Sequence, residues 1–321
     1  MKRTRVCDVL GIEYPIVQGG LGYMSGGELA AAVSNAGGLG TIALTARSED
    51  RTDVKEWPKS YREELQRAKS LTDKPFAANV PMDNTVHDKF VDAILAEGVK
   101  VVVTAAGNPR IYTRVLKDAG VKVMHLVFAV RHAQVAEAEG VDAVIASGAD
   151  GGGFVHLLEL TTMSLVPQIV DAVKIPVLAA GGIADARGLV AAFALGAEGV
   201  QLGTRFMATR ECLGHKNLKD ALVKAGETDT IITGRKSQMA MRCLRNKFTT
   251  EFRDKESEGL SKEALGELGT GRNYRAAIGG EIEMGSIGCS PSVGLIKEIV
   301  GAGDVVRDLV EGYDSIVTGL K

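Results

Sequence analysis

Two glycine turns in the second half of the chain carry the residue types that bind an anion. Gly181-Gly182 follows the apolar run 176–180, and Gly203-Thr204 ends the apolar run 199–203. Glycine turns present bare backbone N–H groups, and the Thr204 hydroxyl is a further donor. Either turn alone could merely tighten a connection between two elements. If the two runs are neighbouring strands, however, their turns converge, and we predict that together they hold a phosphate group.

Two earlier segments have the residue types for the rest of such a site. Gln18-Gly19-Gly20-Leu21 follows the first apolar run, and its bare backbone would let a flat ring lie against it. Asn79 ends the run 76–80 and could present its amide to the same site, although an isolated asparagine is more often a turn residue. We expect Asn108, followed by Pro109, to cap the next helix rather than to bind a ligand.

His156 is the candidate acid or base. It ends the loop SGADGGGFVH, residues 147–156, and imidazole titrates near neutrality. In the alternative interpretation His156 only covers the rim of the site while Phe154 packs on a ligand. Asp150 either fixes the glycine loop by hydrogen bonding or is a turn aspartate. The remaining histidines are expected on helix surfaces (His87, His132, His215) or in the core of a strand (His125).

The elements that must position these residues are eight short apolar runs. They span residues 15–18, 41–44, 76–80, 101–105, 121–127, 143–147, 176–180 and 199–203. Continuous apolar character is typical of parallel strands that are buried on both faces. Helical patterns lie between them, at 27–35, 86–97, 110–119 and 186–195. Eight such units favour an α/β fold, a (β/α)8 TIM barrel over residues 1–206, rather than an open doubly wound sheet.

The rhythm of strands stops after Phe206. Residues 207–275, called the lid below, are polar, charged and helical in pattern, and we predict an inserted helical domain. Residues 276–321 then return to the barrel, with an amphipathic helix expected from about Val293 to Ile316. Four lid cations could meet a coenzyme A or carrier-protein phosphate, but a solvated helix face is the preferred interpretation: Arg235, Lys236, Arg242 and Arg245.

Several segments resemble one enzyme family. PIVQGGLG, PFAANVPM and PVLAAGGIADARGLVAAFALGAEGVQLGTRF are similar to the nitronate monooxygenase (2-nitropropane dioxygenase) superfamily, and TAAGNP and LTTMSL resemble its bacterial FMN-dependent enoyl-acyl carrier protein reductases. The resemblance implies bound FMN, NADH or NADPH as electron donor, and an unsaturated thioester of acyl carrier protein or coenzyme A as acceptor. It implies cofactor contacts at Gly19, Gly20, Leu21, Asn79, Gly181, Gly182, Gln201, Leu202, Gly203 and Thr204.

The loop after the sixth run departs from the family pattern. Relatives carry roughly E-A-G-G-H-x-G there, and the resemblance implies that the histidine is the catalytic acid or base. In this chain the loop is about two residues longer. Counting forward from the strand places Phe154 at the histidine position, whereas counting backward from Leu160 places His156 there. We predict that His156 takes the role and that Phe154 is adjacent to the substrate.

Three functions remain open at this point: an enoyl-thioester reductase, a nitronate monooxygenase that uses dioxygen, and a non-redox sugar-phosphate lyase or isomerase without flavin. The net charge of -2 and the pI near 6.3 argue against nucleic acid as a partner. No apolar run reaches the roughly 20 residues that span a bilayer, so we expect a cytoplasmic protein. The four cysteines form no CxxC pair, so no metal is expected. A homodimer is possible.

Overall fold

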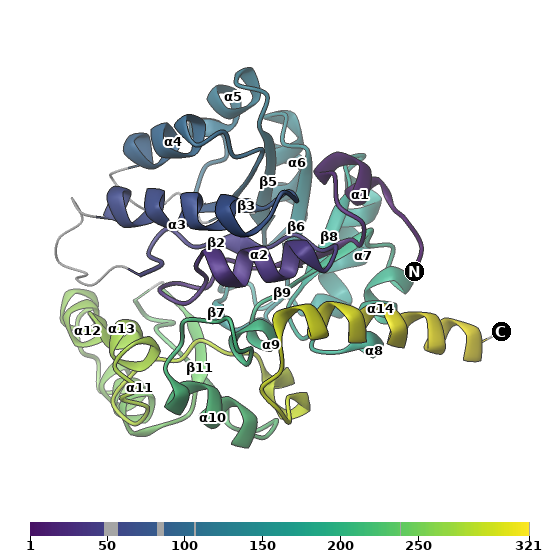
Figure 1. The fold of residues 1–321 in the computed structure, drawn as a ribbon. Helices are drawn as coiled ribbons and strands as arrows, with labels where there is room; N and C mark the ends of the chain where they lie inside the picture. The colour runs from purple at the N-terminus through teal and green to yellow at the C-terminus, as the bar shows by residue number, and fades with distance from the viewer. Residues whose placement is uncertain (48–56, 82–86, 106, 238, 321) are drawn as a thin grey trace.

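Eight parallel strands form a barrel in the computed structural model, which describes residues 1–47, 57–81, 87–105, 107–237 and 239–320 (Figure 1). The strands are β1 (Ile16–Gln18), β9 (Gly199–Leu202), β8 (Val177–Ala180), β6 (Ala143–Ser147), β5 (Lys122–Val127), β4 (Val101–Ala105), β3 (Ala77–Pro81) and β2 (Thr41–Ile42), in this spatial order. Leu39, just before β2, pairs with Val17 of β1 and closes the ring. The predicted barrel is confirmed, and each strand ends within two residues of its predicted run.

Helices connect the strands and cover the outside of the barrel. They are α1 (Arg5–Leu10), α2 (Gly27–Asn35), α3 (Trp57–Leu71), α4 (His87–Ala96), α5 (Arg110–Asp118), α6 (Val130–Ala138), α7 (Thr162–Ala172) and α8 (Ala186–Ala194). Shortly after α4, α5, α6 and α8, a glycine takes a positive φ, which other residues adopt only with strain. Val86, predicted to begin α4, and Ala106 of the TAAGNP segment lie outside the described residues.

The interior of the barrel is filled by apolar side chains and closed at its amino end. Val17, Val103 and Leu178 belong to a buried cluster that also includes Val6 and Leu10 of α1. Helix α1 therefore plugs the end of the barrel from which the strands start. Gln18 is fully buried and ties β1 to β2, because its Oε1 accepts a hydrogen bond from the Thr41 N–H at 2.8 Å. The opposite end, where the strands finish, is left for the site.

The lid contains strands as well as the predicted helices (Figure 1). It continues from α9 (Thr204–Met207) through α10 (Lys216–Lys224), α11 (Lys247–Ser257), α12 (Lys262–Gly269) and α13 (Arg272–Ala277). Between α10 and α11, β10 (Thr230–Thr233) and β11 (Met241–Leu244) form an antiparallel hairpin, and β7 (Gly153–Phe154) adds to it from the loop after β6. The sequence predicted only helices for the lid, and this sheet was not predicted. Its third strand, β7, comes from a distant segment of the chain. The lid boundaries at 207 and 275 stay a prediction.

The predicted helix from Val293 to Ile316 starts later than expected. A short 3₁₀ turn, η1 (Pro291–Leu295), comes first, and α14 begins at Ala302 and ends at Gly319. The start is set by a cap, since the Asp304 carboxylate accepts a hydrogen bond from the Gly301 N–H at 2.9 Å. Helix α14 packs on α2 and α8 of the barrel. In the part of the chain that the structure describes, no helix is both long and apolar enough to cross a membrane.

Candidate active site

A cavity of about 1160 Å³ opens at the carboxyl ends of the barrel strands. Every residue predicted for the site lines it: Gly19, Gly20, Leu21, Asn79, Phe154, His156, Gly181, Gly182, Gln201, Leu202, Gly203 and Thr204. These residues come from β1, β3, β8, β9 and the loop after β6. Parallel strands end on one face of a barrel, so the structure brings the segments together as the sequence predicted. Their individual roles stay a prediction.

The two glycine turns present unused backbone donors to the cavity. Gly181 and Gly182 have φ values of 100° and 77°. The N–H groups of Gly181, Gly182 and Gly203 have no hydrogen-bond partner among the described residues. A Cβ atom at Gly181 would lie 2.9 Å from the Gly148 carbonyl oxygen and the Gly151 nitrogen, so only glycine fits. The turns can therefore donate to an anion without losing any bond within the protein.

Thr204 and Ser290 extend this donor group. The Thr204 Oγ1 accepts a hydrogen bond from the Ser290 N–H at 3.0 Å, which leaves the Thr204 hydroxyl proton available to a ligand. The Ser290 hydroxyl in turn donates to the Asp150 carbonyl at 2.6 Å. Ser290 also lines the cavity. Ser290 was not predicted, because it lies 86 residues beyond Thr204 and its segment carries no local signal of the contact.

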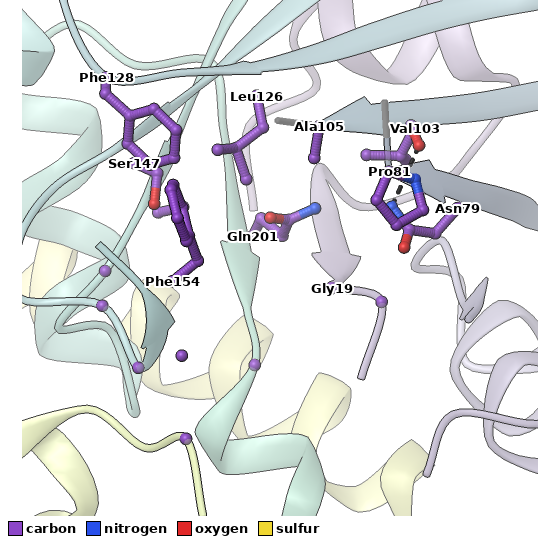
Figure 2. A pocket seen from close by; sticks show the side chains of 18 of the residues that line it. Gly19, Asn79, Pro81, Val103, Ala105, Leu126, Phe128, Ser147, Phe154 and Gln201 are labelled. Carbon is purple, nitrogen blue, oxygen red and sulfur yellow. Dashed lines mark hydrogen bonds between the residues drawn. The ribbon is translucent and has the colours of Figure 1, made fainter. Parts of the chain in front are cut away.

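Gln201 is a buried polar side chain that points into the cavity (Figure 2). It is 8% exposed, and its amide makes no hydrogen bond to a described residue. Because Gln201 lines the cavity, its amide is available to a ligand that has both donors and acceptors. Asn79 lies across the cavity and donates through Nδ2 to the Val103 carbonyl at 3.1 Å. A Cβ on Gly20 would lie 2.7 Å from the Asn79 Oδ1, so Gly20 allows close packing there.

The loop after β6 is fixed by the lid and by α7. The Asp150 carboxylate accepts a hydrogen bond from the Thr162 N–H at 2.6 Å, in the first turn of α7. Asp150 thus ties the loop to a helix, whereas the first of its two predicted interpretations was a hydrogen bond to the backbone of the loop itself. Beyond it, Gly153 and Phe154 pair with Arg242 and Met241 of β11. The longer loop is accommodated as an added strand.

This loop brings His156 to the mouth of the cavity. The His156 ring stacks on Phe128, with 5.4 Å between ring centroids. Its Nδ1 accepts a hydrogen bond from the Leu158 N–H at 3.2 Å, which places the proton of the neutral ring on Nε2. Partial burial and the nearby His132 lower the pKa of His156. The imidazole is therefore neutral at pH 7 and can donate through Nε2. The Phe154 ring packs edge-on against Phe128 at 5.8 Å.

Two further histidines line the cavity. His125 was expected to be a core residue, and it is buried, but one side of its ring faces the cavity. Its Nδ1 lies 2.7 Å from the Thr104 Oγ1, and burial, with a smaller effect of His132, lowers its pKa to about 4. His132 was predicted on a helix surface, and it is a half-buried residue of α6 whose surface lines the cavity, where its ring packs edge-on against His156 at 5.4 Å. Its place in the first turn of α6, after β5, was the overlooked signal.

His215 also departs from its prediction, because it caps α10 rather than lying on a helix face. Its Nδ1 accepts a hydrogen bond from the Asn217 N–H at 3.1 Å. Asn108 caps as expected, since its Oδ1 accepts from the Arg110 N–H at 3.0 Å. The His87 side chain lies outside the described residues.

The four lid cations do not form one helix face. Arg242 and Arg245 lie on or next to β11, and Arg235 and Lys236 lie in the turn before it. Arg235 pairs with Glu159 at 2.7 Å, and the Lys236 ammonium donates to the Glu256 carbonyl at 2.9 Å. The Arg242 Nε donates to the Ala149 carbonyl at 3.1 Å, which fastens the lid to the loop after β6. The preferred prediction of a solvated helix face was therefore wrong, because these cations are bonded within the protein.

Comparison with known proteins settles the family. A family model described as nitronate monooxygenase matches residues 3–89 and 83–312. The chain belongs to the nitronate monooxygenase family. The resemblance seen in the sequence is thus confirmed, and the chain is an oxidoreductase of this family.

Relatives within the nitronate monooxygenase family have different names. A protein of Rhodococcus jostii named (3aS,4S,5R,7aS)-5-hydroxy-7a-methyl-1-oxo-octahydro-1H-indene-4-carboxyl-CoA dehydrogenase is 36% identical over 75% of this chain and 65% of its own length, so this chain spans less than two thirds of it. A probable nitronate monooxygenase of Staphylococcus saprophyticus is 35% identical over 79% of this chain and 82% of its own. The structure of FabK from Thermotoga maritima superimposes with a TM-score of 0.92, 40% identity, and coverage of 100% of this chain and 99% of that one.

Proposed function

We propose that the protein is an FMN-dependent reductase that uses NADH or NADPH to reduce the double bond of an enoyl thioester. The observation that carries the proposal is the cavity, whose lining combines the free N–H groups of two glycine turns with exposed apolar side chains and an imidazole. Its volume of about 1160 Å³ lies above the range of about 300–1,000 Å³ that is usual for one small ligand. A cofactor and a second substrate can share it.

The residues present fit FMN. The free N–H groups of Gly181, Gly182 and Gly203 would hold its phosphate, because successive backbone donors bind phosphate oxygens without a cationic side chain. The unpaired Gln201 amide would meet polar atoms of the flavin ring. Gly19 and Gly20 would lie against the ring, since neither has a side chain to keep it away.

The mouth of the cavity fits an acyl thioester better than a small nitronate. Phe154, Met239 and Val135 line it, although their side chains are 43%, 59% and 41% exposed. Exposed apolar side chains around a cavity mark a surface that buries an apolar ligand. The Rhodococcus jostii relative is also named for a substrate bound to coenzyme A. We also propose that acyl carrier protein can deliver the substrate and that the chain forms a homodimer.

His156 would act on the thioester carbonyl. FMN, when bound, supplies hydride transfer to the β carbon of the double bond. Negative charge then develops on the carbonyl oxygen, where a positioned donor stabilises it, and a proton from water at the α carbon completes the saturated thioester. Neutral His156 has its proton on Nε2, because Nδ1 accepts from the Leu158 N–H. We infer that this Nε2–H donates to the carbonyl oxygen, while the Phe128 ring, on which His156 stacks, keeps the imidazole in place.

Anaerobic stopped-flow spectroscopy tests the proposal. Purified protein is mixed with NADH or NADPH, and flavin reduction is followed by the loss of visible absorbance. Crotonyl-CoA is then added without oxygen. Recovery of the oxidised flavin spectrum, together with formation of butyryl-CoA, supports the proposal. Flavin that is reduced by neither nucleotide, or that crotonyl-CoA does not reoxidise, refutes it.

A nitronate monooxygenase is the second candidate. The family model and the Staphylococcus saprophyticus relative favour it. In a parallel arm, propionate 3-nitronate replaces the nucleotide. Rapid bleaching of the flavin by the nitronate, with no response to NADH or NADPH, would select this function. A protein that is purified without colour and binds no added FMN would instead return attention to a non-redox barrel enzyme acting on a sugar phosphate.

A further inference from the structure

Arg131 is an unpaired cation at the mouth of the cavity. It lies in the first turn of α6, next to His132, and lines the cavity with it. Of the described residues that line the cavity, Arg131 is the only arginine or lysine, and none is an aspartate or glutamate. Its side chain is exposed and makes no ion pair or hydrogen bond with the described part of the chain.

The acidic residue at the other end of the same helix does not neutralise Arg131. Glu139, at the end of α6, accepts from Arg110 at 2.7 Å instead. Other surface arginines beside the cavity loops are also paired, such as Arg235 with Glu159 at 2.7 Å and Arg187 with Asp185. Arg131 therefore keeps a full positive charge toward the cavity, which has no acidic side chain among its described lining residues.

Arg131 and the glycine turns follow different strands of the barrel. Arg131 follows β5, whereas the turns follow β8 and β9, and β6 stands between β5 and β8 in the sheet. The loop after β6, which carries Phe154 and His156, also lines the cavity. A flavin phosphate held at Gly181 and Gly182 would already be bonded by the backbone donors of those turns, two strands away from the strand that precedes Arg131. A ligand of Arg131 would be a second anion, entering from the mouth.

The chemistry at Arg131 suits a phosphate. A guanidinium donates two parallel N–H groups to phosphate oxygens, and the adjacent His132 ring can add one more donor. The start of α6 adds to this, because Ala129 at its N-cap has no side-chain oxygen and leaves the first N–H groups uncovered. We propose that Arg131, with His132, binds a phosphate group of the second substrate. The inference rests on the proposed function and specifies how that substrate is recognised.

Both co-substrates of the proposed reaction carry such a group: the thioester in coenzyme A and the donor in NADPH. Calorimetric titration of the flavin-loaded protein with coenzyme A, NADP⁺ and phosphate-free pantetheine separates them. Arg131→Ala and Arg131→Lys are compared with wild type. Arg114→Ala is the matched control, because Arg114 is an exposed arginine of α5 that does not line the cavity. Substitution of a side chain this exposed is not expected to disturb folding.

We expect Arg131→Ala to weaken binding of the phosphorylated ligand about three- to tenfold, as for loss of one solvent-accessible charged contact. Arg131→Lys should recover part of the loss, and Arg114→Ala and pantetheine should show no effect. Weakening with coenzyme A alone assigns the site to the thioester, and weakening with NADP⁺ alone assigns it to the nucleotide. Affinities for both that are unchanged by Arg131→Ala, or wild-type protein that binds neither, overturn the proposal.

The outcome is separable from that of the proposed function. If coenzyme A binding depends on Arg131 but crotonyl-CoA is not reduced, the phosphate site stands and the reductase function fails. If crotonyl-CoA is reduced with equal KM by wild type and Arg131→Ala, and the titrations also agree, the function stands and the phosphate site fails.

Discussion

His125 makes the stability of the barrel depend on pH in a way that can be calculated. The ring is 4% exposed, and burial lowers its pKa from 6.5 to about 4. In the unfolded chain the imidazole takes up a proton below about pH 6.5, whereas in the folded protein it stays neutral until about pH 4. Stability that is present above pH 6.5 is therefore lost as the pH falls from about 6.5 to about 4.

The size of the loss follows from the shift. Each pKa unit corresponds to about 1.4 kcal/mol, so moving from pH 7 to pH 5 crosses about 1.5 units and costs about 2 kcal/mol. His125→Gln removes the titration while keeping a polar side chain that can still bond to Thr104. We expect the free energy of unfolding of wild type to fall by about 2 kcal/mol more than that of His125→Gln over this pH range.

Urea unfolding at pH 7 and pH 5, followed by the fluorescence of the single tryptophan, Trp57, measures both proteins. His215→Gln is measured in parallel as a histidine variant outside the barrel interior, because His215 caps α10 at the surface. The reasoning is refuted if wild type and His125→Gln lose the same free energy between the two pH values. That result would mean that His125 is protonated in the folded protein.

Three further predictions concern the site. Gly20→Ala should release FMN, because the added Cβ would lie 2.7 Å from the Asn79 Oδ1 and displace that side chain. Gly266→Ala is the exposed control, and equal FMN affinity in the two variants would contradict this prediction. His156→Gln should lower turnover of crotonyl-CoA about 100-fold without changing flavin content, and unaltered turnover would remove His156 from the chemistry. Asp150→Ala should destabilise the protein by about 1 kcal/mol in urea unfolding, because α7 loses a backbone cap; an unchanged midpoint would argue against that role.

The sequence alone determined the barrel and the position of the site. Eight apolar runs could be recognised as strands because burial on both faces leaves a local pattern that needs no knowledge of partners. Gly19, Asn79, Gly181 and Gly203 lie at or just beyond the carboxyl ends of such runs, and parallel strands in a barrel end on one face. The sequence pattern therefore predicts that these residues surround one opening of the barrel. The start of α14 was misjudged, because an amphipathic pattern continues across a residue where a cap begins the helix.

Only the tertiary structure decided what surrounds His156. Gly153 and Phe154 became a strand because β11, which lies more than 80 residues later, offered backbone partners, and such pairing leaves no trace in a local pattern. His132 and His125 joined the cavity wall because α6 and β5 bring them there. Burial and, to a smaller extent, the nearby His132 lower the pKa of His156 and of His125, and neither effect exists until the chain has folded.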